Sequence, residues 1–288
     1  MSGGPELRFY MNKMALDSFP PSSFPQTSFA ESLERLAAAG YQGIQFAERA
    51  SPEQLKSCRS LKMGIAVSGR MNSAAEAGKL AEQFAGDGYE CATIHAGWGL
   101  EDDAQAGHLI EGILNASVRW RIPLYIETHR ATLCQDMWRS VQFANRFPEM
   151  RFNGDFSHWY AGQEMVYGGF EKKLEFIRPV LERVRFLHGR IASPGCIQVT
   201  IDPDANPEPV YVSHFRQLWT AAFRGFHLQQ AADSAAFLCF SPELLAPEIF
   251  YARTFGGEEE SDRWQQSLLL GKIARECFAS ASRLDSQN

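Results

Sequence analysis

The chain has 288 residues, of which 45% are hydrophobic and 22% charged, a composition typical of a folded globular protein. Its formal net charge of -6 argues against broad, sequence-independent binding to nucleic acid, because such binding needs Lys and Arg to neutralise phosphates. The six cysteines are scattered without a Cys-x-x-Cys pair, so the sequence suggests neither a zinc ribbon nor a disulfide framework.

The cysteines and the distribution of apolar residues also indicate the cellular compartment. Free cysteines in apolar runs fit a reducing environment. The first residues lack a basic segment followed by an apolar one, and no apolar run is long enough to span a bilayer. We therefore expect a cytoplasmic protein with no membrane partner.

Strand-like and helix-like segments alternate along the chain. The expected strands are Leu7–Met14, Gly43–Glu48, Met63–Gly69, Cys91–Gly97, Pro123–His129, Arg151–Gly154, Val184–Arg190 and Ala235–Phe240. The expected helices are Ser28–Ala39, one beginning at Pro52, Ala74–Gly86, Leu109–Arg121, Met137–Phe147, Phe170–Arg183, Phe215–Phe223 and Asp262–Ser282. Such a repeat predicts an α/β fold, a single (β/α)8 TIM barrel over residues 1–288.

A doubly wound open sheet is the competing architecture. That fold would more naturally carry a Gly-rich phosphate turn after its first strand, and the segment after Met11 has none. No low-complexity stretch or break in composition marks a linker between domains. The barrel is therefore the favoured prediction.

Polar side chains gather where the predicted strands end, which is where a TIM barrel places its active site. They are His95, Glu127, His129, Asp155, His158, His188, Arg190 and Glu243. Residues two apart share a strand face, so Glu127 and His129 point the same way. Taken alone, an Asp-x-x-His such as Asp155 and His158 is more typical of a capped turn than of a site.

Three carboxylates at one barrel mouth would repel one another and take up protons unless a cation shared them. Glu127, Asp155 and Glu243 with the imidazole of His188 make an oxygen-rich set of ligands. Such a set suits one divalent metal ion, Mn2+, Mg2+ or Co2+, with Zn2+ as a further option. The sequence does not choose among these ions.

The strand-end motifs IHAG, IETHR, GDFSHW, FLHGR and FSPEL resemble those of the xylose isomerase-like TIM-barrel superfamily. The resemblance implies that Glu127, Asp155, His188 and Glu243 are the metal ligands, with Glu127 and Glu243 also acting as the catalytic acid and base. It implies that His158 contacts the substrate and that Arg190 holds a substrate oxygen. His95 matches a histidine that some members use for substrate or metal.

The same resemblance implies an isomerase or epimerase of the sugar branch. Its substrate would be a small-molecule carbohydrate, ketose, polyol or related hydroxy-carbonyl compound, and its mechanism α-proton abstraction through a metal-stabilised enediolate. His129 would supply a further hydrogen bond. Trp98 and Trp159 would either line a sugar face or pack within loops, and the Pro-rich segment Ser193–Tyr211 would be either a lid or an ordered crossover. No nucleic acid partner is expected, and the formation of a homo-oligomer stays open.

Three alternatives remain. A lyase of the inosose or dehydroshikimate dehydratase type would use the same metal ring. An endonuclease IV-like repair enzyme would need a further Asp-x-His between His188 and Glu243, and the interval offers only Asp202 and Asp204 well before His214. A non-catalytic sugar-binding barrel is suggested by departures from the family pattern, such as Gln45 where many epimerases have a glutamate.

Overall fold

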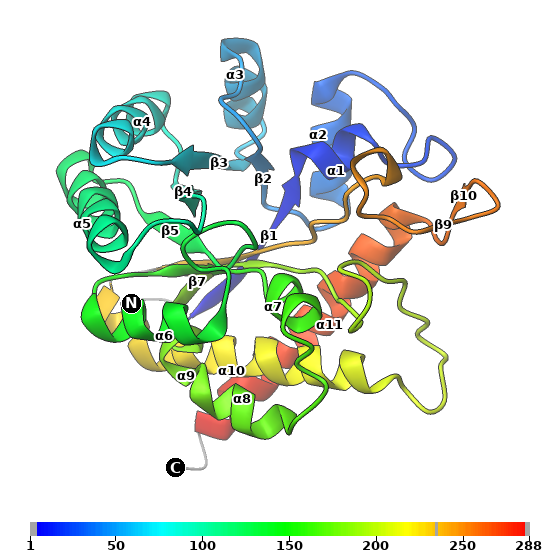
Figure 1. The fold of residues 1–288 in the computed structure, drawn as a ribbon. Coiled ribbons are helices and arrows are strands. Elements are labelled where there is room, and N and C mark those ends of the chain that lie inside the picture. Colours follow the sequence, from blue (N-terminus) through cyan, green and yellow to red (C-terminus); the bar gives the residue numbers. More distant parts are fainter. Residues whose placement is uncertain (1–4, 234–235, 286–288) are drawn as a thin grey trace.

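The structure, a computed structural model, describes residues 5–233 and 236–285. Eight parallel strands close into a barrel in chain order, with β8 returning beside β1, and helices surround it (Figure 1). This confirms the predicted (β/α)8 TIM barrel. The barrel strands are β1 (Glu6–Asn12), β2 (Gly43–Phe46), β3 (Gly64–Met71), β4 (Cys91–Ala96), β5 (Leu124–Glu127), β6 (Phe152–Gly154), β7 (Val184–His188) and β8 (Phe237–Ser241).

The helices lie on the outside of this barrel, with α10 and α11 packed side by side (Figure 1). They are α1 (Lys13–Asp17), α2 (Phe29–Ala38), α3 (Pro52–Ser60), α4 (Ala74–Asp87), α5 (Asp103–Trp120), α6 (Met137–Arg146), α7 (Ser157–Gly162), α8 (Phe170–Phe176), α9 (Arg178–Leu181), α10 (Val210–Asp233) and α11 (Arg263–Asp285). A short 3-10 helix, η1 (Pro247–Ile249), and a hairpin of β9 (Thr254–Phe255) and β10 (Glu258–Glu259) follow β8.

Local capping signals explain where several helices begin. Ser28 and Ser51 cap α2 and α3 through capping boxes, in which the N-cap side chain and the third helical residue bond each other's backbone. Asp102 does the same for α5, so this helix starts at Asp103 and not at the predicted Leu109. The capping aspartate was the signal that the prediction of α5 missed.

Other predicted boundaries were also wrong. The single helix predicted over Phe170–Arg183 is divided into α8 and α9, because Pro179 has no N–H to continue the ladder of helical hydrogen bonds. The helix predicted over Phe215–Phe223 is the longer α10. For the last strand, β8 starts at Phe237, and the predicted first residue, Ala235, lies outside the described residues.

The barrel interior is apolar at its amino-terminal end. Tyr10, Cys91, Phe186 and Cys239 are buried together there. The ring of Tyr10 lies against Gly43 and Gly64: a Cβ would fall 2.4 Å from a ring carbon at Gly43 and 2.0 Å from the hydroxyl at Gly64. These glycines therefore leave the space in which the tyrosine ring fills the barrel, and its hydroxyl donates to Glu90 at this end.

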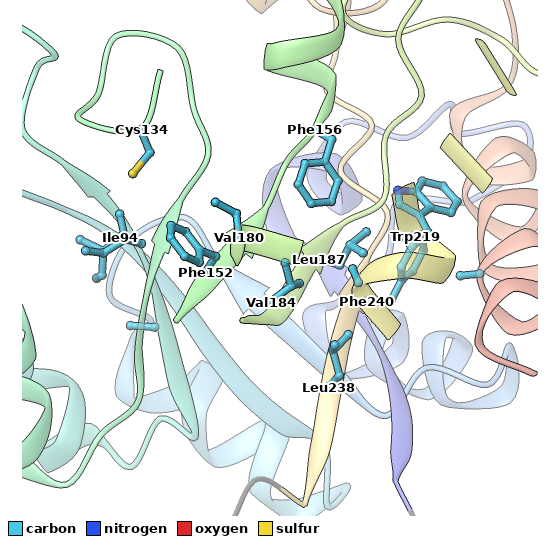
Figure 2. Close-up of a cluster of buried hydrophobic side chains, with 14 of the residues drawn as sticks. Ile94, Cys134, Phe152, Phe156, Val180, Val184, Leu187, Trp219, Leu238 and Phe240 are labelled. Carbon is cyan, nitrogen blue, oxygen red and sulfur yellow. The ribbon is translucent and has the colours of Figure 1, made fainter. Parts of the chain in front are cut away.

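The larger core fills the space between strands and helices. Figure 2 shows Phe152, Leu187, Leu238 and Phe240 of the strands in one buried cluster with Trp219 of α10, which lies beside Phe240. The rings of Trp219 and Phe240 meet edge to face with centroids 5.1 Å apart. This packing fixes β6, β7 and β8, whose carboxyl ends carry much of the predicted site.

The Pro-rich segment 193–211 is held to the following elements. Gln198 exchanges two hydrogen bonds with the backbone of Leu245, and Ile201 bonds Gln266 of α11 in both directions. Val199 and Ile201 are buried. These contacts are those of an ordered crossover and give no sign of a free lid. Within the described residues, no helix combines the length and apolar character needed to cross a membrane.

Candidate metal centre and substrate pocket

The carboxyl ends of β5 to β8 bring the four predicted metal ligands together. Glu127 is the last residue of β5, Asp155 follows β6, His188 ends β7 and Glu243 follows β8. Nδ1 of His188 lies 3.5 Å from Glu127 Oε1, 4.0 Å from Asp155 Oδ2 and 3.5 Å from Glu243 Oε2. Two ligands of one ion with metal–ligand distances near 2.1 Å are separated by about 3.0–4.2 Å. The donor atoms of Glu127, Asp155 and His188 all lie within 4.8 Å of one another, so these three residues fit a small divalent ion. Among the described residues, Glu243 is not part of that group and approaches it only through His188.

In each carboxylate, one oxygen is bonded to a neutral donor. Asn153 Nδ2 donates to Glu127 Oε2 (2.9 Å), Asn12 Nδ2 to Glu243 Oε1 (3.2 Å), and the Ser157 backbone N–H to Asp155 Oδ1 (3.1 Å). The second oxygens of Asp155 and Glu243 both contact Arg190. Partners of this kind orient metal ligands. None of the three neutral donors was predicted, because an isolated Asn or Ser at a strand end carries no chemical signature in a sequence.

Gln45 orients the histidine of the set. Its amide nitrogen donates to Thr93 Oγ1 (2.9 Å) and Ser68 Oγ (3.0 Å), so its oxygen is left to accept from His188 Nε2 (3.0 Å). The sequence marked Gln45 as a departure from the glutamate of many epimerases. The structure places this glutamine behind the ligand, where it leaves His188 Nδ1 to face the carboxylates.

The charges of the centre are mutually dependent. Burial alone would raise the pKa of Glu127, but His188 and His95 outweigh it and hold that pKa well below its usual range. Asp155 is affected in the same way, since Arg190 and His158 overcome the effect of burial and lower its pKa. Both carboxylates are therefore ionised and available to a cation at neutral pH.

The stability of the metal-free protein should depend on pH through His188. Burial lowers the pKa of His188, but Glu243 and Glu127 outweigh it and raise that pKa from 6.5 to about 9. A raised pKa stabilises the folded state fully below pH 6.5, and this stabilisation is lost as the pH rises toward 9. We expect metal-free protein to lose about 1–3 kcal/mol of stability across that window.

The measurement is the melting temperature of chelated protein between pH 6 and 9.5. His188→Gln should remove most of the decrease, leaving a smaller part from His95, whose pKa Glu127 also raises against burial. With saturating Mn2+ the slope should flatten or reverse, because the ion displaces the proton. An equally steep decrease in His188→Gln would contradict this assignment.

A pocket of about 270 Å³ opens above the centre. Glu127 and Glu243 both line it, and so do Asn12, Ser68, Arg70, His95, His129, Leu245 and Tyr251. Glu243 is the more accessible of the two carboxylates, with 14% of its side chain exposed against 2% for Glu127. A pocket of this size with polar side chains in its wall suits a small polar substrate.

Three imidazoles form a row beside this pocket. The ring centroids of His95 and His129 are 4.3 Å apart, and those of His129 and His158 are 3.8 Å apart. His95 Nε2 lies 3.4 Å from Glu127 Oε1, while burial lowers the pKa of His129 to about 3. His129 is therefore neutral, and it offers hydrogen bonds without adding charge. His95, Glu127 and His129 also lie close enough to form a second possible ligand group.

Arg190 was predicted to contact the substrate, but the structure places it outside the lining of the pocket. Arg190 is buried and pairs with Asp155, with its Nη2 also 3.1 Å from Glu243 Oε2 and its Nε donating to Ser157 Oγ (3.1 Å). It is not among the residues that line the pocket. The structure thus gives Arg190 the role of holding two carboxylates, because a buried guanidinium beside ionised oxygens pairs with them.

The two tryptophans do not form a wall of the pocket. Trp159 is fully buried and donates its ring N–H to the carbonyl of Cys134 (2.9 Å), which agrees with the packing alternative and not with a sugar-facing wall. Trp98 is 54% exposed, and the guanidinium of Arg70 stacks on its ring at 3.9 Å. It contacts a pocket residue but does not line the pocket itself. A strand-end position alone could not distinguish these surroundings.

Comparisons with known proteins agree with this architecture. No protein-family model and no curated protein matches the sequence. The chain is similar to the solved structure of a D-allulose 3-epimerase from Methylomonas sp., with a TM-score of 0.53, 12% identity, and coverage of 98% of this chain and 100% of that one. It is also similar to a probable 3-DHS dehydratase from Bacillus anthracis (TM-score 0.53, 12% identity, 82% and 92% covered).

A third similar structure is a xylose isomerase-like TIM barrel protein from Mycobacterium smegmatis in complex with magnesium (TM-score 0.51, 12% identity, 94% and 97% covered). Identities this low carry information about the fold and not about the reaction. The chain therefore has the fold of the xylose isomerase-like TIM barrels, as the strand-end motifs predicted.

Proposed function

We propose that this protein is a divalent-metal-dependent isomerase or epimerase acting on a sugar, ketose or related hydroxy-carbonyl compound. One observation carries the proposal: Glu127 and Glu243 line the same pocket, and each has an oxygen 3.5 Å from the same atom, His188 Nδ1. Two carboxylates on either side of one centre suit the removal of a proton from carbon and its return.

The four predicted ligands, Glu127, Asp155, His188 and Glu243, would hold the ion. In the structure Arg190 contacts an oxygen of Asp155 and an oxygen of Glu243, and the ion would share these carboxylates with it. When bound, a divalent ion supplies Lewis-acid chemistry: it polarises the substrate carbonyl and makes the neighbouring C–H more acidic. Mn2+, Mg2+ and Co2+ suit the three carboxylates, and the similar protein in complex with magnesium supports such an ion. Asn12, Asn153, Gln45 and Arg190 keep these donors in place.

In the proposed reaction, one of the two carboxylates removes the proton from the carbon beside the carbonyl and gives an enediolate. Return of a proton by the other carboxylate, on the opposite face, inverts that carbon and epimerises the substrate. Return by the first carboxylate to the neighbouring carbon isomerises it. His95 and His129 line the pocket, where they can hydrogen-bond substrate hydroxyls.

A lyase is the second candidate function. It would begin with the same proton abstraction and then expel a β-hydroxyl, and the similarity to a probable 3-DHS dehydratase supports it. The nuclease receives no support: His214 stacks on Phe170 with ring centroids 3.7 Å apart and hydrogen-bonds Tyr160, so it does not join the metal ligands.

The test is a screen for proton exchange. Mn2+-loaded protein in D2O is incubated with ketoses, aldoses and keto-inositols, and the recovered compounds are analysed by mass spectrometry and NMR. Deuterium at an α-carbon with an epimer or isomer as product supports the proposal, whereas loss of water points to the lyase. Absence of exchange across the panel would argue against both.

A further inference from the structure

A second cavity, of about 630 Å³, adjoins the pocket above the metal centre. Tyr251 lines both spaces, and His158 of the second one stacks on His129 of the first. The walls of the second cavity come from the loops after β5, β6, β7 and β8. A substrate with its reacting carbon near Glu127 and Glu243 can therefore extend past Tyr251 into this space.

The two spaces differ in charge. The first has Glu127, Glu243 and Arg70 in its wall, whereas the described lining of the second includes Arg130 and Arg253 and no carboxylate. The second cavity therefore favours an anion at the end of the substrate that is remote from Glu127 and Glu243.

The two arginines are not equivalent. Arg253 is already paired with Glu260, which accepts from both its Nε (2.8 Å) and its Nη2. Arg130, among the described residues, pairs with no carboxylate, and its guanidinium stands 5.3 Å from the ring centroid of Tyr251. His158, which is buried in the wall of the same cavity, has an Nδ1 with no hydrogen-bond partner among the described residues. Arg130 is exposed in the wall of the cavity, and its guanidinium is open to a ligand there.

We propose that the substrate carries an anionic group, a carboxylate or a phosphate, and that Arg130 binds this group in the second cavity. Arginine suits the task because its planar guanidinium donates two parallel hydrogen bonds to such oxygens. Arg130 lies near Tyr251, which lines both spaces. This proposal depends on the proposed function in one respect: it takes the anion bound in the second cavity to be part of the enzyme's substrate.

The experiment is calorimetric titration of three ligands that have no carbonyl and cannot react: D-glucitol, D-gluconate and D-glucitol 6-phosphate. Mn2+-loaded protein should bind at least one of the two anions about tenfold or more tightly than glucitol, the effect of a charged hydrogen bond. Arg130→Gln should abolish this preference. The double variant Arg253→Gln/Glu260→Gln, which removes an already neutral pair, should keep it.

Repeating the titrations without metal separates this proposal from the proposed function. Arg130 is not a predicted ligand, so its preference for anions should persist in chelated protein, even if the protein fails every test of proton exchange. Tighter binding of D-gluconate would indicate a substrate with a carboxylate, and tighter binding of D-glucitol 6-phosphate a substrate with a phosphate. Equal binding of all three ligands by the parent protein, or an unchanged preference in Arg130→Gln, would overturn the proposal.

Discussion

Replacing His188 with alanine is expected to weaken Mn2+ binding by more than about 100-fold, because the site then loses its only nitrogen ligand and three carboxylates remain without an oriented partner. The residue is 2% exposed, and its ring touches the oxygens of Glu127 and Glu243. Titration of metal into chelated protein, followed by calorimetry, measures the change. Turnover should fall in parallel.

Two further variants make this prediction sharper. Gln45→Leu keeps every ligand but removes the acceptor for His188 Nε2, so we expect an intermediate loss of about 10–100-fold in affinity. If His188→Ala does not fold, Gln45→Leu still tests whether His188 binds the metal. His108→Ala, on the exposed face of α5, is the matched control and should bind metal like the parent. Parental affinity in both His188→Ala and Gln45→Leu would show that the ring is misassigned.

Glu243→Gln is expected to slow turnover by about 10²–10⁴-fold, the usual contribution of a positioned acid or base. The amide keeps the size of the side chain and an oxygen that can reach a metal, but it cannot take up a proton. The effect should therefore appear in kcat at saturating Mn2+ and should not be restored by more metal. Initial rates on whichever compound exchanges deuterium provide the measurement.

The matched control for this variant is Glu248→Gln, because Glu248 lies exposed on η1 in the same loop. It should retain the parental rate. Turnover of Glu243→Gln within about threefold of the parent at saturating metal would remove Glu243 from the acid and base role. Glu127→Gln should show a loss of similar size, since its oxygen lies at the same 3.5 Å from His188 Nδ1.

The sequence predicted the barrel because the alternation of buried strands with helices is a repeated, chain-long signal. It also placed Glu127, Asp155, His188 and Glu243 at neighbouring strand ends, since all parallel strands end on the same face of a barrel. Helix boundaries were less predictable: α5 depended on a capping aspartate, and the break between α8 and α9 depended on a single proline. These are local features that periodicity does not detect.

The surroundings of the predicted ligands could not be inferred from the sequence. Asn12, on β1, and Glu243, after β8, meet only because the barrel closes, and they are 231 residues apart in the chain. The role of Gln45 depends on Thr93 and Ser68, which lie on two other strands and belong to none of the strand-end motifs. Arg190 was predicted to touch substrate, yet its charge is engaged by Asp155 and Glu243, an arrangement set by side-chain direction at the end of β7.

The most direct test of the proposed metal centre is anomalous diffraction from crystals soaked in Mn2+. We predict one strong peak surrounded by Glu127, Asp155, His188 Nδ1 and Glu243, which is lost in His188→Ala. A sole peak between His95, Glu127 and His129, the other possible ligand group, would contradict this prediction. So would the absence of any peak at the mouth of the barrel at saturating Mn2+.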